Sequence, residues 1–239
     1  MALTSLYVEP EAADRTVEWP ALECRDVFKI YRSGPVETVA LRGLDLRVEH
    51  GEVVAVLGPS GGGKSTFLSL AAGLDQPSAG EVRVDGQSLG RLDEQELARY
   101  RARDLALVFQ SDNLWPALSA EENVLTALRL SGRQARAADA RAALETFGVG
   151  RRAGHRAGAL SGGEQQRVAI AAAAARRASL VLADEPTGEL DARNESLVLD
   201  ALHRLRHEAG STVVVVTHSA KVAESVDRVV ELRDGRVVA

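Results

Sequence analysis

The chain has one cysteine, Cys24, among its 239 residues. A single cysteine excludes an internal disulfide and is typical of proteins that fold in a reducing compartment. We expect Cys24 to be a small buried residue near a strand. Long apolar runs are missing as well, since no stretch of about 18 consecutive apolar residues, enough to span a bilayer, occurs in the sequence. The sequence therefore predicts no transmembrane helix.

An excess of positive charge is also missing. The 29 Lys and Arg residues are outnumbered by 34 Asp and Glu residues, which gives a net charge of −5. Nucleic-acid-binding domains normally present a basic surface, so we expect no nucleic-acid partner. Residues 1–20 have no apolar core of the kind that directs secretion and carry several acidic side chains. They predict a flexible N-terminal extension instead of a signal peptide.

The clearest feature that is present is a glycine-rich segment between a predicted strand, Val53 to Leu57, and a helix expected over 66–73. It matches the phosphate-loop pattern G-x-x-x-x-G-K-[S/T] with the residues Gly58, Pro59, Ser60, Gly61, Gly62, Gly63, Lys64, Ser65 and Thr66. Glycines let successive backbone N–H groups turn toward phosphate oxygens, and the helix N-terminus adds partial positive charge. We expect Lys64 to reach the β- and γ-phosphates and the Ser65 hydroxyl to bind Mg²⁺.

The rest of the chain predicts one α/β domain over 21–239. Leu44, Leu46 and Val48 alternate with charged residues, as in a strand with one buried face, whereas 180–183 and 213–217 are continuous apolar runs typical of buried parallel strands. Other strands are expected at 81–84, 105–109, 228–232 and 236–238, and helices at 93–103 and 191–209. Residues 112–160 lack strand signals and predict an inserted helical subdomain, in which Ser119 and Glu122 match a capping box.

Two further motifs carry polar groups next to apolar segments. The strand Leu180 to Ala183 ends in two carboxylates, Asp184 and Glu185; a strand end of this kind is usually just solvated, so the pair is weak evidence alone. The second motif opens a long helix with Leu160, Ser161, Gly162, Gly163, Glu164, Gln165, Gln166 and Arg167. Its double glycine is costly in an ordinary capped helix and leaves bare N–H groups at the positive helix end, which predicts a second anion site.

With these motifs in this order, the sequence from about residue 22 to 239 resembles the ATP-binding-cassette (ABC) ATPases. The resemblance implies a P-loop NTPase fold with a mostly parallel core sheet, an antiparallel β subdomain and an inserted helical subdomain. It implies an ATPase that uses ATP and Mg²⁺. The roles of single residues follow only from the resemblance of the whole ordered set of motifs. It implies that Tyr31 stacks on adenine with Val39 packed nearby, that Gln110 senses Mg²⁺ and the lytic water, and that Asp191 lies in the loop that crosses a dimer interface.

The resemblance also implies a mechanism. Ser65, Gln110 and Asp184 hold Mg²⁺, Glu185 activates the attacking water, and His218 and Lys64 stabilise charge at the γ-phosphate. Each ATP lies between the phosphate loop of one copy and the Ser161–Gly162–Gly163 helix end, with Glu164, of a second copy arranged head to tail. Three departures from the family pattern stand out: Gly62 for Ser, Glu189 for Asn, and the alanine run 171–175.

Residues 110–124, 40–45 and 155–156 are similar to the branch that contains lipoprotein-releasing and macrolide- or peptide-exporting ATPases. This similarity implies separate integral membrane permease subunits, reached through the loop around Gln110, and a place on the cytoplasmic face of the membrane. For Trp115 in this loop, a partner contact and a packing role both remain open. Two alternatives remain open, the ATPase of a binding-protein-dependent importer and a non-transport ABC protein. The transported substrate is not predicted.

Overall fold

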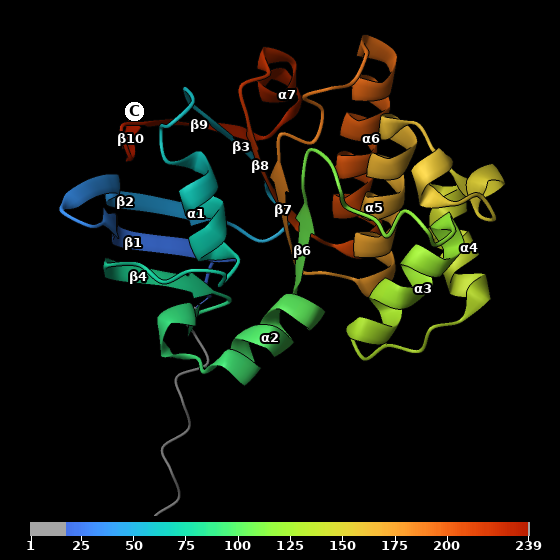
Figure 1. The fold of residues 1–239 in the computed structure, drawn as a ribbon, viewed down its shortest axis with the longest axis horizontal. Coiled ribbons are helices and arrows are strands. Elements are labelled where there is room, and N and C mark those ends of the chain that lie inside the picture. Colours follow the sequence, from blue (N-terminus) through green and yellow to red (C-terminus); the bar gives the residue numbers. More distant parts are fainter. Residues whose placement is uncertain (1–17, 239) are drawn as a thin grey trace, which may run out of the picture.

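The computed structural model describes residues 18–238, and the chain in this range folds into two sheets with helices between and around them (Figure 1). The predicted extension at 1–20 lies almost wholly outside the described residues. Among residues 18–238, none of the helices combines the length and apolar character needed to cross a membrane.

The first sheet is antiparallel. Its strands are β1 (Leu22–Ser33), β2 (Val36–Val48), β4 (Ala79–Val84) and β5 (Gln87–Ser88), in the order β2-β1-β4-β5. Leu44, Leu46 and Val48 are buried while the residues between them are exposed, which confirms the predicted alternation. Cys24 is buried in β1, as expected, and burial raises the pKa of its thiol to about 12, so the thiol stays protonated.

The second sheet is mostly parallel and consists of β3 (Val53–Leu57), β6 (Leu105–Val108), β7 (Leu180–Asp184), β8 (Thr212–Thr217), β9 (Arg228–Arg233) and β10 (Arg236–Val238). The order is β10-β9-β3-β8-β7-β6, and only the β10–β9 pair is antiparallel. Leu57 pairs with Thr217, and Asp184 pairs with Val216. The carboxyl ends of β3, β7 and β8 therefore share one edge, where ligands of such sheets bind.

Helices cover both faces of the parallel sheet. α1 (Lys64–Ala71) packs on one face through Phe67 and Leu70, together with the buried face of the antiparallel sheet. α5 (Gly162–Arg176) and α6 (Ala192–Ala209) pack on the other face. α5 is flanked by α3 (Ala120–Leu130), α4 (Ala137–Thr146), α6 and β6, which explains its alanine run: Ala171, Ala172 and Ala173 are buried, and small side chains let the neighbouring elements approach closely.

The remaining helical segments are short. They are α2 (Glu94–Arg103), α7 (Ala220–Ser225) and the 3₁₀ turns η1 (Leu89–Arg91), η2 (Gly150–Arg152) and η3 (Ala157–Ala159). The predicted capping box at Ser119 is confirmed, and Ser161 forms a second one, because both hydroxyls accept hydrogen bonds from the backbone N–H three residues later. Between 112 and 160 the structure contains helices and turns, but the boundaries of a separate subdomain stay a prediction.

Several predicted boundaries differ from the structure by one or two residues, and two of these differences have a clear local reason. The helix expected over 66–73 begins at Lys64, because the left-handed Gly63 (φ 100°) ends the loop there. The strand expected to reach Phe109 ends at Val108. The backbone N–H and C=O of Phe109 bond instead to the side-chain amide of Asn113, at 2.7 Å each.

Candidate nucleotide-binding site

The glycine-rich segment forms a loop between β3 and α1 that leaves no room for side chains at two positions. A Cβ on Gly58 would collide with the carbonyl of Leu232, and a Cβ on Gly63 would lie 2.6 Å from the carbonyl of Ala40. A hydrogen bond from the Gly235 N–H to the Gly62 carbonyl (3.1 Å) ties the loop to the β9–β10 turn. Close contacts with the backbone of Ala40, Leu232 and Gly235 therefore hold the loop in place.

Lys64 turns back over this loop. Its Nζ donates hydrogen bonds to the carbonyl oxygens of Gly58 (2.8 Å) and Pro59 (3.0 Å). An ammonium group, a curled backbone and the N-terminus of α1 therefore meet within one loop, and all three favour anionic oxygens. The arrangement fits a chain of phosphates. Ser60, Gly61 and Thr66 complete the loop and the first turn of α1.

Ser65 and Asp184 line the same small cavity at the end of β7, together with Phe109. Burial, and next the charge of Glu185, raise the pKa of the Asp184 carboxyl, while Lys64 and the Ser65 hydroxyl oppose the shift. Among residues 18–238 no cluster of three His, Cys, Asp or Glu side chains could hold a metal alone. One carboxylate and one hydroxyl nevertheless fit Mg²⁺, which keeps several waters and takes its other ligands from substrate phosphates.

Asp184→Asn tests this electrostatic strain. A carboxyl whose pKa is raised by folding costs stability when it is ionised. We therefore expect the variant to melt about 2–4 °C higher than the parent at pH 7 without nucleotide, the change that ~1 kcal/mol gives in a domain of this size. The gain should shrink as the pH falls and the parent carboxyl becomes protonated. Thermal unfolding across pH measures it, and a lower melting temperature at pH 7 would contradict the strain.

Glu185 follows β7 and is held from two sides. Its Oε2 accepts a hydrogen bond from the Thr217 hydroxyl (2.8 Å), and its Oε1 lies 2.7 Å from the Nδ1 of His218. Its backbone is left-handed (φ 46°), which is costly for a residue other than glycine and is typically found at functional sites. The side chain is 18% exposed, whereas that of His218 is 74% exposed. The expected partner of His218 is a phosphate, but in this structure its ring pairs with Glu185.

Gln110 lies in the loop after β6 and reaches toward the loop after Glu185. Its Nε2 is so close to Gly188 that a Cβ there would lie 3.2 Å away. That loop ends at Asp191, whose carboxylate accepts a hydrogen bond from the Asn194 N–H (2.8 Å) and caps α6; this bond lowers the pKa of Asp191. Gln110, Asp184, Glu185 and His218 thus come together at one sheet edge.

Tyr31 and Val39 lie on the neighbouring strands β1 and β2. Val39 pairs with Ile30, one residue from Tyr31, and directly precedes Ala40, which contacts the phosphate loop. The Tyr31 side chain is partly exposed, and its hydroxyl donates to Asp75 (3.2 Å). The antiparallel sheet brings the backbones of these two residues together beside Ala40, while the Tyr31 side chain itself contacts Asp75 and Lys29.

The Ser161 helix end does not join this group. Its capping box is closed by Glu164, which bonds to the Ser161 N–H (2.9 Å) and to Arg152 (2.8 Å). Gly163 packs against Asn194, where a Cβ would lie 2.6 Å from the amide oxygen, and Gly162 approaches Leu190. Because α1 and α5 cover opposite faces of the sheet, one chain presents its two predicted anion sites separately.

Sequence reasoning assigned no role of their own to two side chains in this region, Gln166 and Asn113, although both lie within predicted motifs. Gln166 lies on α5 and is 3% exposed, and its amide bonds to the backbone of the loop that carries Gln110. The available signal was a polar residue on the face of a helix that is otherwise apolar, close to Val168 and Ile170. Such a side chain is normally hydrogen-bonded to something specific.

Comparison with known proteins gives consistent matches. A family model described as ABC transporter matches residues 41–188. The lipoprotein-releasing system ATP-binding protein LolD 2 of Caulobacter vibrioides is 43% identical over 91% of this chain and 96% of its own length. The macrolide export ATP-binding/permease protein MacB of Azoarcus sp. (strain BH72) is 42% identical over 96% of this chain. The chain spans only 35% of that relative's length.

Solved structures agree with the sequence matches. A dimeric ATP-binding cassette in a post-hydrolysis state, bound to ADP and Pi, superposes with a TM-score of 0.83 at 39% identity. The match covers 91% of this chain and 97% of that one. Both the expected fold and the expected pairing of two copies are therefore found in a similar cassette.

Proposed function

The chain belongs to the ABC transporter family, and on that premise we propose that it is the ATP-hydrolysing subunit that drives a membrane permease of the lipoprotein-release or macrolide-export type. The observation that carries the proposal is the match to a lipoprotein-releasing ATP-binding protein over nearly the full length of both chains. ATP binding and hydrolysis are properties of the family; the permease and the residue roles below are our proposal.

The site residues divide the work of hydrolysis by position. The phosphate loop and Lys64 bind the phosphates, while Ser65, Asp184 and Gln110 would hold Mg²⁺. When bound, Mg²⁺ neutralises charge on the phosphates and orients the nucleotide. Glu185 orients the attacking water and accepts its proton on a carboxylate oxygen. The bonds from Thr217 and His218 hold that carboxylate in place, which is the pre-organisation that such catalysis needs.

His218 has a second role in this proposal. Its Nδ1 faces Glu185 in this structure, and the exposed ring can turn so that a ring N–H donates to a terminal phosphate instead. Phosphate binding then changes the contact between His218 and Glu185, the base. Ser161, Gly162, Gly163 and Glu164 act on the nucleotide of the second copy.

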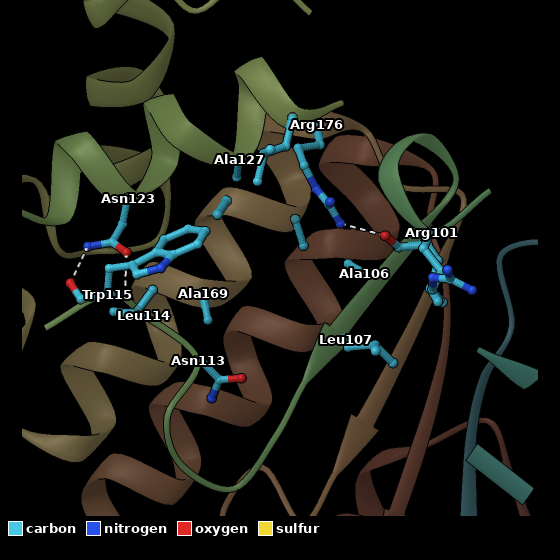
Figure 2. Close-up of a pocket in the computed structure, with 14 residues that line it drawn as sticks. Arg101, Ala106, Leu107, Asn113, Leu114, Trp115, Asn123, Ala127, Ala169 and Arg176 are labelled. Carbon is cyan, nitrogen blue, oxygen red and sulfur yellow. Dashed lines mark hydrogen bonds between the residues drawn. The ribbon is translucent and has the colours of Figure 1, made fainter. Parts of the chain in front are cut away.

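A groove beside the Gln110 loop supports the proposal of a membrane partner. It encloses about 250 Å³ between α2, α3, α5 and β6, and Trp115 and Leu130 stand at its wall with 52% and 62% of their surface exposed (Figure 2). Large exposed apolar side chains beside a hollow mark interaction sites. The occupant that we propose is a cytoplasmic segment of the permease with an apolar face, which places the chain at the cytoplasmic side of the membrane.

Co-purification tests this partner. We expect tagged Glu185→Gln protein, solubilised from membranes with ATP in mild detergent, to retain an integral membrane protein. Trp115→Asp combined with Leu130→Asp should reduce that recovery at least about tenfold, since two buried aspartates would each cost more than 1 kcal/mol at an apolar contact. Val229→Asp, at an exposed apolar residue on β9, is the control and should retain the partner.

The possible outcomes of the co-purification distinguish the proposed function from the proposed docking surface. A membrane protein recovered with the parent and the control, but lost with the groove variant, supports the proposed function and its docking surface. Recovery that is equal for all three moves the contact elsewhere on the chain. If no membrane protein is recovered at all, the permease proposal is wrong while the ATPase family stands.

A further inference from the structure

A buried amide network joins α5 to the loop that carries Gln110. The Nε2 of Gln166 donates to two consecutive carbonyl oxygens, those of Phe109 (2.7 Å) and Gln110 (2.8 Å). Its Oε1 accepts a hydrogen bond from the Nδ2 of Asn113 (2.9 Å). Both hydrogens of the Gln166 amide and its oxygen are therefore used, and the side chain is 3% exposed.

Asn113 completes the network within the loop itself. Its Oδ1 accepts from the Phe109 N–H, and its Nδ2 donates to the Phe109 carbonyl, both at 2.7 Å. Its amide therefore brackets the backbone N–H and C=O of Phe109, the residue directly before Gln110, while Gln166 also holds the Gln110 carbonyl. Because leaving a buried polar group unpaired is costly, these bonds hold the loop against α5 in one register.

We propose that Gln166 and Asn113 are positioning residues that fasten the Gln110 backbone to the helix that begins at Ser161. The inference rests on the proposed role of Gln110 in hydrolysis. Through this fastening the side chain of Gln110 takes its place against Gly188, in the loop that follows Glu185, only when α5 is in its present position. α5 then links two nucleotides. Its N-terminal end presents Ser161 to the nucleotide of the second copy, and its Gln166 positions Gln110 at the nucleotide bound to its own chain.

The arrangement favours this role over simple loop packing. The far end of the same connection has its own buried amide, Asn123, which bonds to Trp115 through its Oδ1 (2.8 Å) and to the carbonyls of Trp115, Leu118 and Ser119. Asn123 anchors the chain where it enters α3. Gln166 and Asn113 act instead on the two residues at the catalytic edge.

Gln166→Met tests the proposal, because methionine keeps the length of the side chain and removes the amide. In nucleotide-free full-length protein, we expect amide hydrogen exchange of residues 109–113 to become at least about tenfold faster, since about 1.4 kcal/mol of local stability is tenfold in opening. In ATP hydrolysis, kcat should fall about 10- to 100-fold with KM within about threefold, because a misplaced group of this kind costs rate and not ground-state binding.

A double-mutant cycle and two further variants complete the experiment. Asn113→Leu with Gln166→Met should lose little more than either single change, because the two residues act as one unit. Ser211→Ala removes a fully buried bond to the Ala178 carbonyl (2.6 Å) away from the site, and it should lower stability while leaving kcat and exchange at 109–113 unchanged. Gln110→Ala reports on the site itself.

Each outcome decides something. Faster exchange at 109–113 with a selective fall in kcat supports the proposal. Unchanged kcat in Gln166→Met beside a large loss in Gln110→Ala overturns the positioning role and leaves the site standing. Unchanged kcat in Gln110→Ala overturns both. A fall in kcat that Ser211→Ala reproduces would show a general loss of stability and overturn the proposal.

Discussion

Glu185→Gln is expected to lower ATP turnover by about 10²–10⁴-fold, the usual contribution of a positioned general base, while ATP binding persists. The amide cannot accept a proton from water, but it keeps the shape of the carboxylate and can still bond to Thr217. Unhydrolysed nucleotide then keeps two copies together. Turnover by phosphate release, binding by a fluorescent ATP analogue, and dimerisation by size-exclusion chromatography with ATP measure the three effects.

The control for this variant is Glu224→Gln, which makes the same change at an exposed position on α7. It should hydrolyse ATP like the parent. If Glu185→Gln also hydrolysed ATP at the parent rate, another group would have to accept the proton, and the assignment of the base would be wrong. A loss of nucleotide binding equal to the loss of turnover would instead indicate a structural role for the Glu185–His218 pair.

Lys64→Ala is expected to weaken ATP binding about 10- to 100-fold, because charge-assisted hydrogen bonds are worth roughly 1.5–3 kcal/mol. Turnover should fall below detection, since the same ammonium stabilises charge in the transition state. The melting temperature without nucleotide should change little, because Nζ contacts only two loop carbonyls. Isothermal titration with ATP, a turnover assay and thermal unfolding give the three values.

Lys221→Ala is the matched control. Its ammonium makes a comparable set of bonds, to the Ala192 carbonyl, Glu195 and Ser196, at a place away from the phosphate loop. It should bind and hydrolyse ATP like the parent. Near-normal turnover of Lys64→Ala would show that the loop does not hold the reacting phosphates.

Much of the fold was predictable from local patterns. The four consecutive valines at 213–216 predicted a strand buried on both faces, and the motif at Ser161 predicted the start of a helix. The phosphate loop was predictable because its glycines are required by backbone geometry, as Gly63 shows with its left-handed φ and its close approach to Ala40.

The parts that were not predictable depend on contacts between distant segments. The spacing of Gln166 and Asn113, 53 positions apart, carries no local signal of the bond between them. The pairing of Glu185 with His218 arises from the neighbouring positions of β7 and β8 in the sheet, which only the topology provides. The alanine run was visible in the sequence, but its purpose follows only from the elements packed around α5.

The structure accounts for some of the departures from the family pattern and not for others. Gly62 lies where an added Cβ would be 3.0 Å from the carbonyls of both Leu232 and Pro59, so a serine there would require the loop to shift slightly. The alanines at 171–173 are accounted for by close packing. Nothing in the structure explains Glu189.

Lys64 and Ser161 lie on opposite sides of one sheet, and this separation makes the formation of a complete site depend on the concentration of the chain. A site assembled from two chains follows the law of mass action, so its abundance rises with the square of the free chain concentration until pairing saturates. Dilution alone removes the site without unfolding anything. A scaffold that holds two copies at high effective concentration replaces that dependence with geometry, and activity then follows the number of scaffolds instead of the number of chains.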